Sequence, residues 1–431
     1  MGAARFPGVD EVLGRFLEAP RGEDGFPDGV ARLDSELAGA ALADAGNLWA
    51  KAVGHFAAKS PGTHGLRTRH FLTACGGMDL PRGYTPGAAT PFPADAALEM
   101  REGMTPAARS MVARSAILGG SFAEGSTTLA ALARLGVPAS TLRRKTYRLA
   151  ITCEAAEKDP RPGKVRQGRA FTDTEKARRQ LRDAPGGPLF CALADATGVP
   201  VVPADTEGVK GKGPDERAGT REIKIGACTV CSCIDTKGRP VRDPGADSFI
   251  ASGGTMAEAI SQLRHHADSR GFGVAVRTQF IADGAVSIDL ARSTCFKGAE
   301  FTVDFCHAAH YLHAAADALA LPLREARRLK GLMFRIGAGS AIDSIRRHHA
   351  QALAAAAPAA AALEYLDKRR LHMCYGWLRK NGYFIGSGIV EAACRTIAGR
   401  RCKQSGMHWR HRNATLIAIL LAAFKSGRLN A

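Results

Sequence analysis

The 431-residue chain lacks any apolar run of the roughly 18 residues that a membrane-spanning helix needs. Its longest apolar stretch, LIAILLAAF at residues 416–424, is typical of a buried helix. The first residues also lack the apolar segment and cleavage pattern of a signal peptide. We therefore expect no membrane association and a cytoplasmic protein.

The chain also lacks the cysteine pattern of a disulfide-stabilised protein, because its eleven cysteines are odd in number and scattered. The closest spacing, Cys228-Thr-Val-Cys231-Ser-Cys233, suggests zinc ligands. It lies in an apolar strand candidate without a second ligand pair, so buried thiols are favoured.

Acidic residues are absent from the last forty positions, after Glu391, where eight Lys or Arg occur. The whole chain carries a net charge of +18, but residues 1–103 carry −3 and residues 104–431 carry +21. Such segregation is expected for a polyanion partner, and we predict nucleic acid. Glu391 could pair with Arg395 one helical turn away, or it could bind a metal ion beside a phosphate backbone.

The first half of the chain has helical patterns. Residues 29–59 predict a long amphipathic helix, and residues 65–103 are rich in Gly and Pro, with a strand-like piece at 67–74. A further helix is expected from Pro106, with Thr105 as its N-cap.

Two more helical segments, 121–136 and 140–156, are joined by a short turn and resemble a helix-turn-helix. Ser140 is the predicted cap of the second helix. The alternative is a pair of packed helices with a solvated basic face. The proposed DNA-contacting residues fall within two turns of the second helix: Arg143, Arg144, Lys145 and Arg148.

From residue 188 the pattern changes to that of an α/β domain. The continuous apolar run PLFCALAD predicts a strand that is covered on both faces and ends at Asp195. The sequence from residue 275 predicts another strand, which ends in Asp283-Gly284. Further strands are expected within 220–235, at 248–253 and before a helix that starts near His307, with a helix capped by Thr255 between them. Residues 314–380 look helical throughout.

Three carboxylates of this region can carry chemistry. Asp195 and Asp283 stand at predicted strand ends, where open α/β sheets place their sites, and Glu391 opens a helix after Gly-Ser-Gly. Such acids can bind a pair of Mg²⁺ ions that clamp a phosphodiester. The competing interpretation is that the two Asp residues are ordinary turn residues, which are more common.

The motifs DATGVP, FIADGA, VDFCHAAHYL and GSGIVEAACRTIAGRRCKQSGMHW occur in this order. Together they resemble the DDE transposases of the ISKra group of bacterial insertion sequences, over roughly residues 105–428. The resemblance places the catalytic, metal-binding acids on Asp195, Asp283 and Glu391. It also places a D-x-x-H element on Asp304 and His307, with His307 beside the active site. Asp205 is a rival for the first position, but it lies in polar sequence.

The sequence departs from the family pattern at three places. Asp195-Ala196-Thr197-Gly198 replaces Asp-Gly-Thr-Gly, and His310-Tyr311-Leu312 replaces Glu-His-Leu. Cys75 stands alone where some relatives have paired cysteines, so no zinc ribbon is expected there. The spacing of His307, His310 and His313 turns the outer two about 120° apart on a helix, which does not suit one ion.

The resemblance implies a ribonuclease-H-like mixed sheet in an α/β core, with an all-α insertion and a mainly helical N-terminal region. The expected segments are a helical and irregular region (1–103), a helix-turn-helix (104–157), a basic linker (158–187), the first part of the core (188–309), the helical insertion (310–385), and the catalytic Glu helix with a basic tail (386–431).

The implied function is Mg²⁺-dependent cutting of insertion-sequence ends, with Mn²⁺ as the alternative ion, and joining through the freed 3′-hydroxyl. The expected partners are double-stranded DNA, as terminal inverted repeats and target, and further copies of the chain, near a bacterial nucleoid. Phosphates near the cut would meet Arg400, Arg401 and Lys403. Two alternatives are a decayed transposase that acts as a DNA-binding repressor and a structure-specific nuclease on the same fold.

Overall fold

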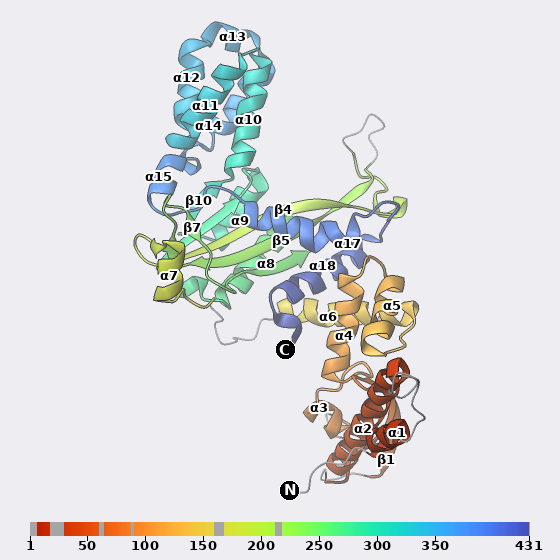
Figure 1. Cartoon of the computed structure of the whole chain (residues 1–431). Helices are drawn as coiled ribbons and strands as arrows, with labels where there is room; N and C mark the ends of the chain where they lie inside the picture. Colours follow the sequence, from red (N-terminus) through yellow and green to blue (C-terminus); the bar gives the residue numbers. More distant parts are fainter. Residues whose placement is uncertain are drawn as a thin grey trace, which may run out of the picture. The chain divides into compact units, whose positions relative to one another are not determined.

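The computed structural model describes residues 7–17, 30–59, 64–87, 90–158, 168–211 and 218–430. The chain divides into two compact units, Met1–Leu149 and Ala150–Ala431 (Figure 1). Within the described ranges, no helix combines the length and the apolar character needed to cross a membrane.

The first unit begins with helices and a hairpin. Its elements are α1 (Pro7–Leu17), α2 (Val30–Lys59), β1 (Leu66–Thr73), β2 (Gly76–Gly83) and α3 (Pro93–Ala97). The predicted long helix and the predicted strand are confirmed as α2 and β1. The partner strand β2 was not predicted, and Gly76, at φ 116°, makes the tight turn that joins it to β1.

Three further helices belong to the predicted helix-turn-helix region: α4 (Pro106–Leu118), α5 (Phe122–Ala133) and α6 (Ala139–Lys158). The Thr105 hydroxyl caps α4 by accepting from the Ala108 amide, as predicted. The predicted cap of α6 is wrong. Its first helical hydrogen bond joins the Leu142 amide to the Pro138 carbonyl, at 2.8 Å, so Ser140 lies inside the helix. Val112, Leu129 and Leu142 form the buried core of this part.

The second unit is built on a five-stranded mixed sheet, which confirms a mixed α/β fold class. Its order is β10-β9-β4-β5-β8. The pairs β4–β5 and β5–β8 are antiparallel, whereas β4–β9 and β9–β10 are parallel. The strands are β4 (Leu189–Pro200), β5 (Thr220–Cys231), β8 (Ser248–Ser252), β9 (Arg277–Ala282) and β10 (Glu300–Val303).

Helices cover this sheet and explain its apolar strands. Residues 189–194 of β4 are all buried, which requires cover on both faces. α8 (Met256–Asp268) and the C-terminal helices described below pack against the sheet, while α9 (Val286–Cys295) packs against α8. Thr255 caps α8 through a reciprocal capping box with Glu258, as predicted for the helix start. Phe280 stacks on Phe296 in the core.

A small second sheet and a short helix precede and flank the main sheet. The small sheet contains β3 (Arg182–Asp183), β6 (Cys233–Ile234) and β7 (Pro240–Val241). The helix, α7 (Asp173–Arg179), lies within the predicted linker 158–187, so that segment is not simply a linker. Residues 159–167 of it lie outside the described residues.

The predicted helical region after the sheet is confirmed. It contains α10 (Phe305–Ala318), α11 (Leu323–Arg335), α12 (Ala338–His348), α13 (Ala350–Ala355), α14 (Ala357–Asp367) and α15 (Tyr375–Lys380). α10 packs on α14 and α11, and these helices stand beyond β10 as a bundle (Figure 1). α10 begins at Phe305, two residues before the predicted start near His307.

The chain ends with helices that return to the sheet. α16 (Gly388–Ala393) continues through a π-helical stretch, Cys394–Gly399, into α17 (Arg400–Cys402), and α18 (His411–Lys425) follows. The apolar run 416–424 lies in α18, where nearly all of its side chains are buried, as predicted.

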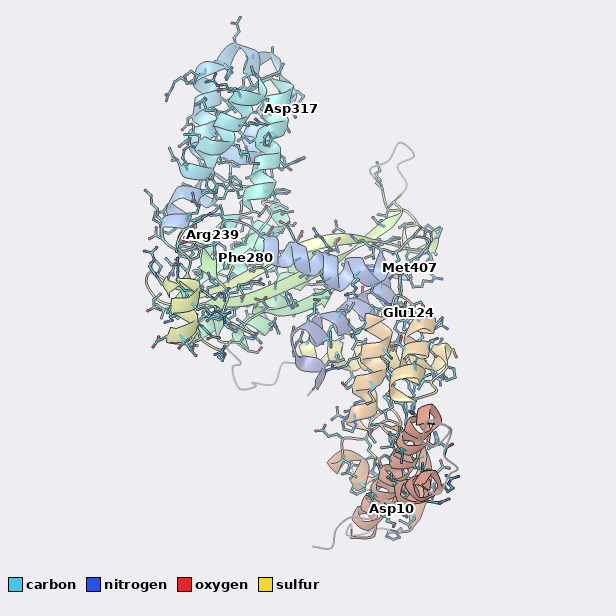
Figure 2. All side chains as sticks on the ribbon, viewed as in Figure 1. Asp10, Glu124, Arg239, Phe280, Asp317 and Met407 are labelled. Atoms are coloured by element: carbon cyan, nitrogen blue, oxygen red, sulfur yellow. The ribbon has the colours of Figure 1, made fainter. Side chains whose placement is uncertain are left out.

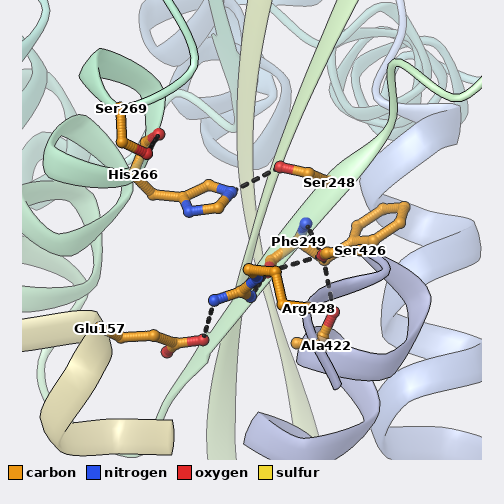
Figure 3. Close-up of polar contacts among 8 residues, drawn as sticks. All are labelled: Glu157, Ser248, Phe249, His266, Ser269, Ala422, Ser426 and Arg428. Atoms are coloured by element: carbon orange, nitrogen blue, oxygen red, sulfur yellow. Dashed lines mark hydrogen bonds and ion pairs between the residues drawn. The ribbon is translucent and has the colours of Figure 1, made fainter. Parts of the chain in front are cut away.

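The end of α18 is fixed to β8 by polar contacts (Figure 3). Arg428 pairs with Glu157 at 2.7 Å and donates to the Phe249 carbonyl at 2.5 Å. The Ser426 hydroxyl accepts from the Phe249 amide at 2.8 Å. Nearby, His266 contacts Ser248 at 2.5 Å, and burial lowers the pKa of His266 to about 3, so this histidine is neutral.

All eleven cysteines are free, which agrees with the absence of a disulfide framework. Cys228, Cys231 and Cys233 are buried in or beside β5, and burial raises the pKa of Cys228 to about 12. These three thiols are therefore buried, as expected from the sequence.

Candidate active site

Asp195 lies in β4, and Asp283 directly follows the neighbouring strand β9. The parallel ladder between β4 and β9 pairs Leu189 with Arg277 and ends with Leu193 opposite Ile281. Asp195 and Asp283 are each two residues beyond this last pair. Residues two apart in a strand share a face, so Asp195 lies on the same face of β4 as Leu193.

The prediction that Asp195 ends its strand is wrong, whereas Asp283 does follow the last residue of β9. β4 runs on to Pro200 because residues 195–200 pair with Ile225–Thr220 of β5. Antiparallel pairing with β5 outweighs the turn-like sequence DATGVP. Asp195 therefore lies where the parallel partner stops and the antiparallel partner continues.

Glu391 enters this region from α16, which contacts both β4 and β5. The Ser387 hydroxyl donates to Glu391 Oε1 at 2.6 Å, so the carboxylate is held by its own helix rather than paired with Arg395. Burial raises the pKa of Asp195, and the negative charges of Asp283 and Glu391 raise it further. The charges of Asp283 and Glu391 therefore act on Asp195.

Protein hydrogen bonds also hold the two aspartates. Asp195 Oδ1 accepts from the Ala196 amide at 2.7 Å, and Cys394 Sγ lies 3.6 Å from Asp195 Oδ2. Asp283 Oδ1 accepts from the Ala285 amide at 2.9 Å. Each acid is thus anchored locally, and the Cys394 contact links β4 to the helix that carries Glu391.

The donor set suits a hard divalent ion such as Mg²⁺, because all three ligand groups are carboxylates. In the part of the chain that the structure describes, however, no group of three or more His, Cys, Asp or Glu side chains is arranged to hold a metal ion. The carboxylates share one region, and binding an ion there would require their side chains to turn toward one another.

Asp304 connects the end of β9, the start of α10 and the segment before α16 through hydrogen bonds. It is 4% exposed, and its amide donates to the carbonyl of Ala282 at 3.0 Å. Its carboxylate caps α10 by accepting from the His307 amide and also accepts from the Ser387 amide, both at 2.7 Å. The D-x-x-H spacing therefore coincides with an N-cap and the third residue of a helix. Its link to Ser387 could not be read from the sequence.

His307 lies half-buried in the first turn of α10. Its ring centroid is 5.4 Å from that of Tyr311 and 6.3 Å from that of Tyr365. Burial raises the pKa of Tyr365 to about 12, and the charge of Asp283 adds to this effect. Arg369 donates to the Gly284 carbonyl. Tyr365 and Arg369 therefore border the segment after Asp283, a role that no sequence signal indicated.

The basic residues after Glu391 differ in exposure. Arg400 and Lys403 are exposed, and Lys403 donates to the Thr197 hydroxyl, two residues after Asp195. Arg401 is only 3% exposed, and its guanidinium lies 5.3 Å from the centroid of the Trp409 ring. We therefore correct the prediction that Arg401 contacts a phosphate, because packing against Trp409 removes its guanidinium from the surface.

The other sequence candidates lie elsewhere. Asp205 accepts from Arg410 at 3.1 Å and from the His411 amide at 2.6 Å, so it anchors the start of α18. In the first unit, Arg143 and Arg144 are exposed on α6. Lys145 donates to the Glu102 carbonyl at 2.9 Å, and Arg148 pairs with the Glu102 carboxylate at 3.1 Å.

The fold and the site define an α/β protein in which Asp195 of the sheet is influenced by the charges of Asp283, which follows β9, and of Glu391 on α16. Comparison with protein-family models and with curated proteins found no match.

Proposed function

We propose that the second unit is a ribonuclease-H-like catalytic core and that the protein is a DNA transposase of the DDE type, similar to the ISKra group. Support comes from three antiparallel strands followed by two parallel strands, with α8 and α9 between them and a helical region before Glu391. The observation that carries the proposal is that the negative charges of Asp283 and Glu391 act on Asp195, which lies in the strand next to β9.

In this proposal, Asp195, Asp283 and Glu391 would hold Mg²⁺, which when bound neutralises charge on the phosphodiester and activates water. The protein positions these ligands through Asp304, Ser387 and the strand register. Arg400 and Lys403 would bind the phosphate backbone beside the cut. Arg143 and Arg144 would contribute to recognition of the DNA ends.

The test is nicking of DNA that contains the sequences flanking the reading frame, with and without Mg²⁺. We expect the wild type to cut only with Mg²⁺ and Asp283→Asn to lose at least 100-fold in rate, since electrostatic stabilisation of this kind is large. The matched control is Asp317→Asn, an exposed position in the helical bundle (Figure 2). Equal cutting by wild type and Asp283→Asn would eliminate the proposed site.

A second candidate is a DNA-binding repressor without catalysis. It is favoured by the finding that no described group of acidic, His or Cys side chains is arranged for a metal ion. This candidate predicts tight binding to the flanking DNA and no Mg²⁺-dependent nicking by any variant.

A further inference from the structure

A large basic groove lies in the second unit, lined by residues outside the three acids and their hydrogen-bonding partners. Its volume is about 1290 Å³, and its lining carries eight Lys or Arg side chains against three Asp. The walls come from residues 168–179, the hairpin and loop 235–247, residues 379–386 and the end of α18, together with Arg270 and Phe334. Figure 2 labels Arg239, which lies on the hairpin.

Neighbouring acids hold several of the arginines in place. Arg169 pairs with Glu175 at 2.5 Å, Arg239 pairs with Asp235 at 2.7 Å, and Arg242 pairs with Asp247. A guanidinium has five N–H donors, so a paired arginine can still donate to a ligand.

Three further cations are exposed and come from separate elements. Arg179 ends α7, Lys237 lies in the hairpin, and Lys425 ends α18. Because the positive charge is spread along the groove, it suits a chain of phosphates better than a single anion. The groove volume also exceeds the roughly 300–1,000 Å³ that is typical of small-molecule sites.

Aromatic side chains accompany these cations. Phe334, Tyr383 and Phe384 line the groove, and the Arg379 guanidinium lies 3.9 Å from the centroid of the Phe334 ring. Tyr383 stacks on Trp377 with ring centroids 5.6 Å apart, and Trp377 is 49% exposed. Proteins that bind single strands combine a cationic track for the backbone with aromatic faces for the bases.

We propose that this basic groove binds a single-stranded polynucleotide. Arg179, Lys237 and Lys425 contact its phosphates, and the bases meet the aromatic wall at Phe334. The lining residues 383–386 directly precede Ser387, whose hydroxyl donates to Glu391. The groove therefore borders the segment that leads into α16. The proposal rests on the proposed function for the source of the strand, but binding requires neither metal nor cleavage.

The test uses the full chain carrying Asp283→Asn, in EDTA, and the fluorescence anisotropy of a labelled oligothymidylate of about 15 nucleotides, a length within the site sizes of single-strand binders. The groove variant combines Arg179→Gln, Lys237→Gln and Lys425→Gln. The control combines Arg178→Gln, Lys297→Gln and Arg324→Gln, which are exposed and outside the groove, and it changes the net charge equally.

We expect the groove variant to bind at least about 10-fold more weakly and the control less than about 2-fold more weakly. The slope of log affinity against log salt should fall by about 2 in the groove variant, since each lost phosphate contact of a single strand lowers it by about 0.7. Equal losses in both variants, or no loss in the groove variant, would overturn the proposal.

Three further binding measurements define the ligand. Phe334→Leu should weaken binding at least about 5-fold if bases stack there. Oligouridylate of equal length distinguishes RNA from DNA as the source of the strand. Groove-dependent binding that is tighter for a blunt duplex would overturn the single-strand assignment. If the groove binds single strands but the wild-type protein does not nick DNA, the proposed catalysis is refuted and the groove proposal stands.

Discussion

At the residue scale, Asp304 connects the start of α10 to the segment before α16, a role that the D-x-x-H motif alone did not indicate. Its spacing to His307 was visible in the sequence, but its bond to the Ser387 amide spans 83 residues and depends on the fold. A buried carboxylate with two amide donors fixes the start of α10 and the approach to α16 together. We therefore regard Asp304 as a positioning residue rather than a metal ligand.

Asp304→Ala should lower the free energy of unfolding by about 2 kcal/mol, because it removes a helix cap and leaves a buried amide at Ser387 without its acceptor. Asp304→Asn keeps a side-chain oxygen and should lose less than about 1 kcal/mol. Chemical denaturation of the full chain measures both. Equal destabilisation by Ala and Asn would show that hydrogen bonding at this position is not what matters.

Asp195 gives a prediction of pH dependence. Burial and the neighbouring acids raise its pKa above the ordinary value of 3.8, so the folded state binds this proton more tightly than the unfolded state does. The contribution of Asp195 to the free energy of unfolding is therefore most favourable below pH 3.8. It declines as the pH rises from 3.8 through the raised pKa of the folded state.

Asp195→Asn should accordingly raise the unfolding temperature at pH 7, by about 2–4 °C for each kcal/mol regained. The difference from wild type should shrink below pH 4. Thermal unfolding across this pH range is the measurement, and Asp317→Asn serves as the control. A variant less stable than wild type at pH 7 would contradict the origin given for the raised pKa.

At the scale of elements, helices with clear caps and apolar runs were predictable, and pairing partners were not. Thr105 and Thr255 marked helix starts because capping is local chemistry. The end of β4 was mispredicted because its pairing with β5 is a tertiary effect. The strand β2 and the helix α9 were not predicted either.

The polar contacts that fix the end of α18 supply a test at the scale of elements. Arg428 pairs with Glu157, whose pKa is raised by burial although the arginine lowers it. Arg428→Met should lower the free energy of unfolding by about 1–3 kcal/mol, less than for a fully buried pair because the arginine side chain is 30% exposed. Adding Glu157→Gln should recover part of the loss in urea denaturation. No recovery would mean that packing, not the stranded charge, causes the effect.

At the scale of the whole molecule, the sequence predicted the α/β class and the segregation of charge. It could not predict the sheet order β10-β9-β4-β5-β8, which brings β4, with Asp195, next to β9, which precedes Asp283. Nor could it indicate that Arg401 is buried or that a basic groove is lined by separate stretches of the second unit. These features arise only when distant segments pack together.

The central claim is that three carboxylates converge on divalent ions, and anomalous scattering from Mn²⁺ in crystals of the wild-type protein tests it most directly. The account predicts an anomalous peak within about 2.5 Å of oxygens from Asp195 and Asp283, with Glu391 on the same centre or on a second ion about 3.5–4 Å away. It also predicts loss of this peak in Asp283→Asn. Mn²⁺ bound elsewhere, or an unchanged peak in that variant, would contradict it.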